Sequence, residues 1–248
     1  MPDVLGYRGK WGVLMPSTNT IVEPDFYALA PHGITFHGSR IYIEDSRLGS
    51  NDQFEHLLEQ VRSSIDRAVI EVMTAEPDYL VMGMSAETFW GGKAGSEQFT
   101  QRMEQLSGLK VSTGADACKL ALQKLGVQRR IAVLTPYQPV ADEQVRTFFA
   151  ESGYDVVRHV GLKCPTAVAI AKVGEETLRP VLQDLNASDV EAIVQVGTNL
   201  SMVRLADEAE RSMKKPVIAI NAATLWHALR VNGITDQRQG FGSLLRDY

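Results

Sequence analysis

Scarce residues exclude several classes of protein for this 248-residue sequence. It has only two cysteines, Cys118 and Cys164, too few for a disulfide framework or a four-thiolate zinc site. No apolar stretch approaches the roughly 18 residues that are needed to cross a bilayer. The opening residues, MPDVLGYRGKWG, contain neither the apolar core of a signal peptide nor a lipidation motif.

A large excess of one charge is also missing. The 25 Lys and Arg residues are balanced by 30 Asp and Glu residues, which gives a net charge of -5, and no dense basic run occurs. This balance predicts neither a nucleic-acid partner nor binding to an anionic membrane. We therefore expect a cytoplasmic protein that acts on a small molecule.

The common cofactor and metal motifs are absent. The sequence has no GxGxxG with a downstream acid, no GxxxxGK[ST], no HExxH and no GxSxG, and the glycine-rich segment Trp90–Ser96 matches none of them. The histidines occur singly, without the spacing of metal ligands: His32, His37, His56, His159 and His227. We therefore predict no cofactor and no metal, and no sequence feature points to a Ser85–His–Asp triad.

Short apolar runs alternate with amphipathic segments along the chain. Strands are predicted over Trp11–Pro16, Ile34–Ile43, Asp78–Gly83, Arg130–Pro136, Tyr154–Val160, Glu191–Gly197 and Pro216–Ile220. One helix is predicted to begin near Glu23, and another is predicted to follow the strand at Gly197 and to end at Met213. Further helices are predicted over Gln53–Ala75, Gly114–Lys124, Val140–Ser152, Pro165–Leu185 (with a break near Gly174) and Ala223–Val231. The alternation predicts an α/β fold with a mostly parallel sheet covered on both faces.

The two halves of the chain contain an internal repeat. Gly12–Pro16 (GVLMP) matches Ala132–Pro136 (AVLTP), and Tyr79–Gly83 (YLVMG) matches Ala192–Gly197 (AIVQVG) with one residue inserted. The interval between the paired motifs is similar in both halves. The repeat predicts duplicated lobes related by a pseudo-twofold axis, one formed by residues 1–112 with 222–248 and the other by residues 113–221.

The loops after the repeated strands are the expected ligand site, because ligands of open α/β sheets bind outside the carboxyl ends of the strands. Hydroxyl and amide side chains stand there beside glycines: Ser17, Thr18, Asn19 and Thr20; Gly83, Met84, Ser85 and Thr88; Thr135, Pro136 and Tyr137; Gly197, Thr198, Asn199 and Ser201. Such neutral donors suit a carboxylate or an oxyanion that develops during a reaction. Each residue taken alone is equally suited to capping the helix that follows.

These loops resemble those of the aspartate/glutamate racemase superfamily, and within it the maleate cis-trans isomerase and arylmalonate decarboxylase branch. The resemblance rests on Pro16–Glu23 (PSTNTIVE), Gly83–Ser85 (GMS), Thr135–Tyr137 (TPY), Gly197–Leu200 (GTNL) and Pro216–Trp226 (PVIAINAATLW), and it extends over nearly the whole chain. It implies two pseudo-symmetric Rossmann-like lobes, each with a mostly parallel four- to five-stranded sheet flanked by helices. It also implies a cofactor-free active site in the interlobe cleft and small mono- or dicarboxylic acids as substrates.

The sequence departs from the family pattern at Gly83 and Gly197. The family's usual chemistry places a cysteine at the end of the third strand of each lobe, where a thiolate moves a proton or adds to a double bond. Arylmalonate decarboxylases also have glycine at the first position but keep the second cysteine, which is absent here. The departure argues against two-base racemisation and against maleate isomerisation by thiol addition.

The anion-holding groups survive this departure. The resemblance implies that Ser85, Tyr137 and Thr198 are catalytic groups that hold the charge of an enediolate, with Tyr137 as proton donor. Asn19 and Asn199 are expected to bind a substrate carboxylate as neutral amides. The predicted substrate-binding set is Pro16, Ser17, Asn19, Gly83, Met84, Gly197 and Asn199.

The two cysteines have different expected roles. Cys118 falls inside a predicted helix and is expected to be a buried, inert thiol. Cys164 precedes Pro165, where a helix is predicted to begin, and a thiol at a helix N-terminus has a lowered pKa. A relocated acid–base role for Cys164 is therefore a hypothesis.

The leading functional hypothesis is a cofactor-independent enzyme for a small carboxylic acid, an arylmalonate-decarboxylase-like lyase that stabilises an enediolate in an oxyanion pocket. A maleate-isomerase-like or racemase-like isomerase is the first alternative. A carboxylate-binding protein without catalysis is the second, and hydrolysis with Ser85 as nucleophile is a weaker third. A homodimer or higher homo-oligomer is also predicted, and the sequence leaves the substrate itself open.

Overall fold

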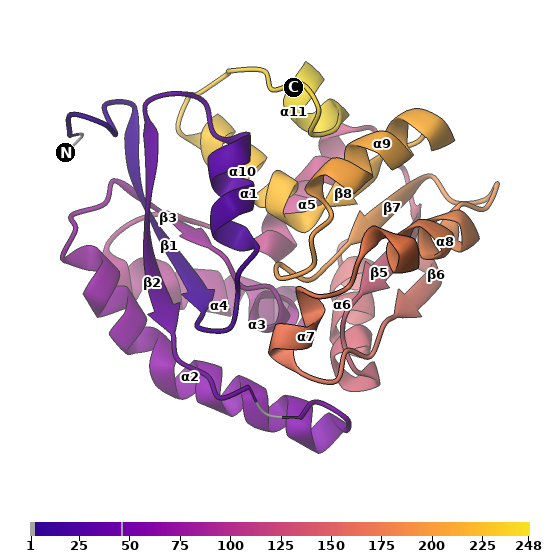
Figure 1. Cartoon of the computed structure of the whole chain (residues 1–248), viewed down its shortest axis with the longest axis horizontal. Helices are drawn as coiled ribbons and strands as arrows, with labels where there is room; N and C mark the ends of the chain where they lie inside the picture. Colours follow the sequence, from indigo (N-terminus) through magenta and orange to yellow (C-terminus); the bar gives the residue numbers. More distant parts are fainter. Residues whose placement is uncertain (1–2, 46) are drawn as a thin grey trace.

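Two parallel sheets with the same strand order form the centre of the molecule (Figure 1). The computed structural model describes residues 3–45 and 47–248. The first sheet has the order β2-β1-β3-β4 and the second the order β6-β5-β7-β8. Their strands are β1 (Gly9–Pro16), β2 (Ile34–Ile41), β3 (Tyr79–Met82), β4 (Val111–Ser112), β5 (Arg130–Thr135), β6 (Asp155–Gly161), β7 (Ala192–Gln195) and β8 (Val217–Ala219). The predicted pair of pseudo-symmetric α/β lobes is confirmed, with four strands in each sheet.

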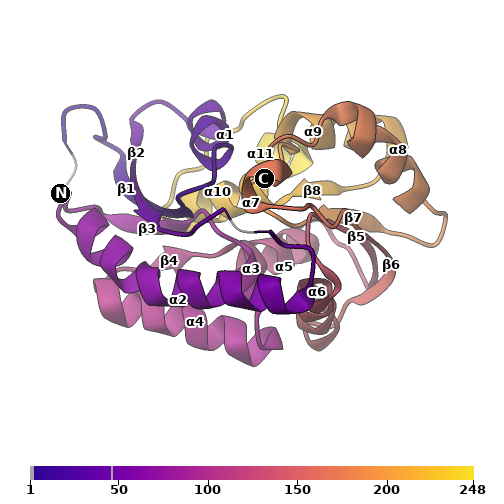
Figure 2. The ribbon, with the colours of Figure 1, turned by 60° about the horizontal axis from the view of Figure 1, so that its bottom comes forward.

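Helices connect the strands and cover both faces of each sheet. They are α1 (Val22–Leu29), α2 (Asn51–Met73), α3 (Ala86–Phe89), α4 (Gly92–Ser107), α5 (Gly114–Lys124), α6 (Pro139–Glu151), α7 (Ala167–Ile170), α8 (Glu175–Leu185), α9 (Val203–Met213), α10 (Ile220–Val231) and α11 (Ser243–Asp247). In Figure 2, α2 and α4 lie on one face of the first sheet, and α1 and α10 lie on the other. Because helices cover both faces, β3 and β7 are buried along their whole length. Their residues are accordingly apolar, except for Gln195 at the end of β7.

The sequence of α2 determines both where this helix begins and which of its faces is buried. The Ser50 hydroxyl caps its first turn by accepting a hydrogen bond from the Gln53 N–H. Its buried side chains recur at three- and four-residue steps: Phe54, Leu57, Leu58, Val61, Ile65, Ala68, Val69 and Val72. This stripe turns the whole length of α2 towards the first sheet.

Helix α10 crosses from one sheet to the other. It starts directly after β8 of the second sheet but packs against α1, β3 and β4 of the first. Its largest helix contact is with α5, where a side chain at Gly114 would collide with Ile220. The α5–α10 pair therefore lies between the two sheets and joins them. The residue boundaries that the sequence suggests for the lobes remain a prediction.

Aromatic side chains join the two halves on another side. Phe89 of α3 packs edge-on against Phe148 of α6, with ring centroids 5.0 Å apart, and Phe149 lies 5.8 Å from the same ring. All three side chains are fully buried. Because the contact crosses between the halves, it couples their stability.

The predicted break near Gly174 is confirmed, because the segment Pro165–Leu185 forms two helices, α7 and α8, and Gly174 is the capping residue of α8. Two predicted helix starts were wrong: α7 begins at Ala167 rather than Pro165, and α10 begins at Ile220 rather than Ala223. Helix α4 was not predicted, because it begins at Gly92 with Gly91 as its capping residue, and glycines are poor helix formers. Gly91 and Gly92 adopt positive φ angles of 78° and 64°, which glycine tolerates without strain.

The aromatic contact gives a test of this coupling. Replacing Phe148 with alanine should lower the free energy of unfolding by about 3–5 kcal/mol, because a fully buried ring leaves a cavity. Urea unfolding followed by both circular dichroism and tryptophan fluorescence measures the change. We expect one coincident transition in the wild type and the variant; separate transitions for the two halves would contradict the coupling.

Candidate functional site

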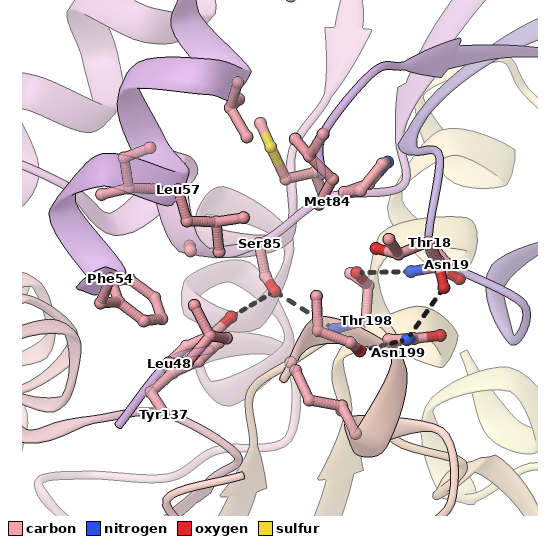
Figure 3. Close-up of a pocket in the computed structure, with 18 residues that line it drawn as sticks. Thr18, Asn19, Leu48, Phe54, Leu57, Met84, Ser85, Tyr137, Thr198 and Asn199 are labelled. Carbon is pink, nitrogen blue, oxygen red and sulfur yellow. Dashed lines mark hydrogen bonds between the residues drawn. The ribbon is translucent and has the colours of Figure 1, made fainter. Parts of the chain in front are cut away.

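A cavity opens where the carboxyl ends of β1, β3, β5 and β7 meet (Figure 3). Residues from both halves of the chain line it: Pro16, Thr18, Asn19, Ile43, Leu48, Phe54, Leu57, Leu58, Val61, Met84, Ser85, Ala86, Tyr137, Ala167, Ile170, Gly197, Thr198 and Asn199. The predicted cleft between the lobes is thus present. None of these lining residues is Asp, Glu, Lys, Arg or His.

Two hydroxyls and a backbone N–H form the polar centre of the cavity. The Ser85 hydroxyl oxygen lies 2.6 Å from the Tyr137 hydroxyl oxygen and accepts a hydrogen bond of 3.2 Å from the Thr198 N–H. Ser85 belongs to the loop after β3, whereas Tyr137 and Thr198 follow β5 and β7. Burial raises the pKa of Tyr137 well above its usual range, so the phenol keeps its proton.

Thr198 is fixed by further contacts with the first half of the chain. Its hydroxyl donates to the Gly83 carbonyl at 3.0 Å and accepts from the Asn19 amide at 3.2 Å. The Asn19 side-chain oxygen in turn accepts from the Ile21 and Val22 N–H groups, both at 3.0 Å, and so caps the start of α1. The Asn19 side chain therefore holds both α1 and Thr198 in place.

Asn199 makes the reciprocal connection from the second half. Its side-chain oxygen accepts from the Thr20 N–H at 3.0 Å, and its amide donates to the Ala167 carbonyl at 3.0 Å. Both site asparagines line the cavity with side-chain atoms that already bond to protein. The Asn199 amide also donates to the Thr18 carbonyl at 3.4 Å, so it has to exchange one of these bonds in order to bind a substrate carboxylate, whereas the Asn19 amide donates, within the described residues, only to Thr198 and keeps a second hydrogen for that purpose.

Backbone N–H groups around the cavity are better placed to receive an anion. Within the described part of the chain, the N–H groups of these lining residues donate no hydrogen bond: Thr18, Met84, Ser85, Gly197 and Asn199. N–H groups near a buried site normally have partners. Together with the two hydroxyls, they provide neutral donors for a carboxylate or an oxyanion.

An apolar wall faces these polar groups, and Met84 alone among its residues was predicted to belong to the site. It consists of Ile43, Leu48, Phe54, Leu57, Leu58, Val61, Met84 and Ile170. Phe54 also packs edge-on against the Tyr137 ring, with centroids 5.5 Å apart. The wall could not be recognised earlier because the α2 side chains in it continue the same stripe that packs on the sheet.

Most of the predicted site residues line the cavity, and the others lie outside it. The predicted residues that line the cavity are Pro16, Asn19, Met84, Ser85, Tyr137, Gly197, Thr198 and Asn199. Ser17 does not, since its hydroxyl donates to the Ile43 carbonyl and accepts from the Ile43 N–H, both at 3.1 Å. Gly83 contributes only the carbonyl that Thr198 contacts. Ser17 and Gly83 therefore act on the loops around the cavity and not on its contents.

The reasoning that gave Cys164 an acid–base role was wrong. The adjacent helix, α7, begins at Ala167 with Thr166 as its capping residue, so Cys164 is not at the helix N-terminus. Burial raises the pKa of this thiol instead of lowering it. Cys164 does not line the cavity. Cys118 is buried as expected, and burial also raises the pKa of its thiol.

The two positions where the family carries cysteine have little room for a side chain here. Gly197 has a φ of +116°, a conformation that L-residues rarely adopt, and a Cβ atom would lie 2.5 Å from the Pro136 Cδ. A Cβ atom at Gly83 would lie 2.9 Å from the Val22 Cγ1. The backbone at Gly197 is therefore shaped for glycine, and at Gly83 the packing of Val22 and Met15 leaves little space for a side chain. Across residues 3–45 and 47–248, no group of three or more His, Cys, Asp or Glu side chains is arranged to hold a metal.

Behind the cavity lies a half-buried carboxyl that was not predicted from the sequence. The Asn221 amide donates to the Asp25 carboxyl at 2.8 Å and to the Thr198 carbonyl at 2.9 Å. Burial raises the pKa of Asp25 from 3.8 to about 6. No local motif signals this contact, because Asp25 and Asn221 are far apart in the sequence.

Known proteins match this chain in sequence and in fold. A model of the arylmalonate decarboxylase family matches residues 11–245. The maleate isomerase of Pseudomonas putida is 24% identical over 247 residues, which cover 94% of this chain and 96% of that protein. The arylmalonate decarboxylase of Bordetella bronchiseptica is 29% identical over 167 residues, covering 66% of this chain and 69% of the relative.

A solved structure supports the fold. The maleate cis-trans isomerase of Nocardia farcinica, in a cysteine-to-serine variant with a covalently bound succinylcysteine intermediate, superposes with a TM-score of 0.86. It is 22% identical, and the alignment covers 96% of this chain and 98% of the other. The relative therefore shares the paired-sheet architecture.

The raised pKa of Asp25 predicts how stability varies with pH. Because the folded protein binds this proton more tightly than the unfolded chain, the carboxyl lowers stability as the pH rises from about 4 through about 6. Asp25→Asn should therefore increase the free energy of unfolding at pH 8 by about 1–3 kcal/mol, and the gain should vanish near pH 4. Thermal unfolding across this range measures it. The exposed Asp66→Asn is the control, and an equal gain at both pH values would contradict the assignment.

Proposed function

The chain belongs to the arylmalonate decarboxylase family, and from this premise we propose that it is a cofactor-independent enzyme that removes CO₂ from a malonate-type acid with an apolar substituent. The observation that carries the proposal is the division of the cavity. Hydroxyls and unpartnered N–H groups occupy one side and an apolar wall the other, with no ionisable side chain other than the Tyr137 phenol among the lining residues.

This division suits the two carboxylates of a malonate. One carboxylate binds the neutral donors around Ser85 and Thr198, which stay in place as charge develops on it. The other is left against the apolar wall, where it loses the hydration that stabilises its charge. Breaking the bond between this second carboxylate and the α-carbon releases neutral CO₂ and leaves the electron pair as an enediolate on the retained carboxylate. The reaction thus moves charge from the apolar side to the polar side.

Tyr137 is the proposed proton donor to the α-carbon. Its phenol stays protonated because burial raises its pKa, and its hydrogen bond to Ser85 places it at the polar centre. The α-carbon of an enediolate is a far stronger base than a phenolate, so the transfer is downhill even from a weak acid. The phenolate then recovers its proton from water, with the Ser85 hydroxyl as the nearest donor that stabilises it.

Isomerisation by thiol addition is a weaker candidate for this chain. The Nocardia farcinica relative carries a succinylcysteine intermediate, which requires a thiol at the reacting carbon. Neither cysteine here lines the cavity, and Gly83 and Gly197 stand where the family has its thiols. Hydrolysis by Ser85 is also disfavoured, because a Tyr137 with a raised pKa is a poor general base.

The setting of the proposed enzyme follows the sequence analysis. We propose a cytoplasmic enzyme with a small carboxylate as its partner and with no nucleic-acid or membrane partner. No helix in the described part of the chain has the length and apolar character needed to span a bilayer. The expected homodimer or higher homo-oligomer remains a prediction.

Phenylmalonate and its 2-methyl derivative test the proposed reaction. We expect CO₂ release in deuterated water with one deuteron incorporated at the α-carbon, followed by NMR. Ser85→Ala and Tyr137→Phe should each lower kcat by on the order of 10²–10³, because each removes a donor to the enediolate.

Cys164→Ser is the matched control, since this buried residue does not line the cavity, and its turnover should stay within about twofold of wild type. Exchange of an α-proton of phenylacetate without loss of carbon would indicate a racemase-like activity instead. Tight binding of these acids with no turnover would leave a carboxylate-binding protein.

A further inference from the structure

A half-buried carboxyl lies outside the cavity and behind one of its loops. Asp25 is the fourth residue of α1 and is covered from the side of α10, whose Asn221 contacts it. Within the described residues it forms no ion pair. A buried carboxyl without a counterion is unfavourable unless other contacts stabilise it, and such groups concentrate at functional sites.

The Asn221 amide has only one favourable orientation. Its nitrogen donates one hydrogen to the Asp25 carboxyl at 2.8 Å and the other to the Thr198 carbonyl at 2.9 Å. Its side-chain oxygen is buried without a hydrogen-bond partner. Turning the amide over would place that oxygen against the Thr198 carbonyl oxygen, which is repulsive. An ionised Asp25, which accepts only, therefore keeps the nitrogen facing Thr198.

The Thr198 carbonyl belongs to the same peptide group as the Asn199 N–H. In a trans peptide the C=O and N–H point in opposite directions. Asn221 holds the carbonyl from outside the cavity, because Asn221 is not one of its lining residues. The Asn199 N–H consequently points away from Asn221, and it is one of the cavity N–H groups without a partner.

We propose that Asp25 and Asn221 are positioning residues that aim the N–H of the peptide after Thr198 at a substrate carboxylate. The inference rests on the proposed function, in which this cavity binds a carboxylate. It adds a buried chain of contacts, from α1 through α10 to the loop after β7, that sets the strength of that binding.

The chain of contacts makes carboxylate binding sensitive to pH. Among the charged groups on the surrounding elements, the Arg204 guanidinium of α9 is the one that acts on the Asp25 carboxyl. Glu23, its neighbour on α1, is paired with Arg40 of β2. Burial raises the pKa of Asp25 to about 6. Below that pH the carboxyl acquires an O–H donor, for which the Asn221 oxygen becomes the better partner, and the Thr198 carbonyl loses its donor.

Binding of phenylacetate, measured by calorimetry between pH 5.0 and pH 8.0, tests the inference on the intact chain. At pH 8.0, Asp25→Ala and Asn221→Ala should each weaken binding about tenfold, the effect of one lost hydrogen bond. Asp25→Asn, whose neutral amide resembles the protonated carboxyl, should bind phenylacetate at pH 8.0 about as weakly as the wild type does at pH 5.0, and it should lose the decrease near pH 6 that the wild type shows. Asp66→Asn, on the surface of α2, should match the wild type.

A second readout needs no ligand. The amide resonance of Asn199 in ¹H–¹⁵N spectra should shift with a midpoint near pH 6 in the wild type and in Asp66→Asn, and it should not do so in Asp25→Asn. The same spectra show whether each variant is folded. Because Asp25→Asn preserves the shape of the side chain, this measurement stands even where an alanine variant is unfolded.

The outcomes separate the two proposals. Equal phenylacetate affinity in wild type, Asp25→Ala and Asn221→Ala overturns the positioning role while leaving the proposed function intact. An Asn199 resonance that titrates in the same way in wild type and Asp25→Asn overturns it as well. A wild type that neither binds phenylacetate nor releases CO₂ from phenylmalonate overturns the proposed function and the inferred use of this peptide, even where the resonance still follows Asp25.

Discussion

Hydrogen bonds that cross between the two halves at the base of the cavity set the position of the whole site. Thr198 donates from its hydroxyl to Gly83 and from its N–H to Ser85, and Ser85 bonds to Tyr137. Each of these bonds joins a loop of one sheet to a loop of the other. A shift of either half would therefore break the polar centre, which explains why the aromatic contact between α3 and α6 and the α5–α10 pair matter for a site that they do not line.

The two halves share the same arrangement of strands, but equivalent positions in them make different contacts around the site. Each half places an aspartate at the fourth residue of the helix that follows its first strand, Asp25 in α1 and Asp142 in α6. Asp142 accepts a hydrogen bond from the Thr135 hydroxyl, which accepts the Tyr137 N–H at 3.2 Å. Asp25 instead reaches the site through Asn221. Equivalent helices thus support different loops, one carrying the Tyr137 hydroxyl and the other carrying N–H groups.

The sequence was enough to predict the strand ends and the hydroxyl-rich loops, because buried strands ending at Pro16, Gly83, Pro136 and Gly197 have a local signature. It was not enough for features that depend on tertiary packing. The apolar wall shares its residues with the ordinary buried stripe of α2. The environment of Cys164 depends on where α7 begins, and a thiol beside a proline has no local sign of burial.

The contact of Asp25 with Asn221 also could not be predicted from the sequence. Each residue alone fits an ordinary helix start, and only the packing of α1 on α10 brings them together. Above pH 6 the ionised Asp25 carboxyl lowers the stability of the fold. An asparagine of the same shape would fill the same space without a charge, so packing alone does not require an aspartate at this position. Sites that retain such an unfavourable group commonly do so for function.

The glycines at the family's thiol positions extend this argument to the reaction. A cysteine at Gly197 would have to adopt a positive φ and press against Pro136, so its absence is built into the backbone of the loop. The same left-handed turn leads directly into the Thr198 and Asn199 N–H groups, of which one contacts Ser85 and the other has no partner. A loop that the family resemblance would lead one to expect to present a thiol therefore presents backbone donors here. That exchange favours a reaction limited by holding negative charge over one that needs a nucleophile or a second base.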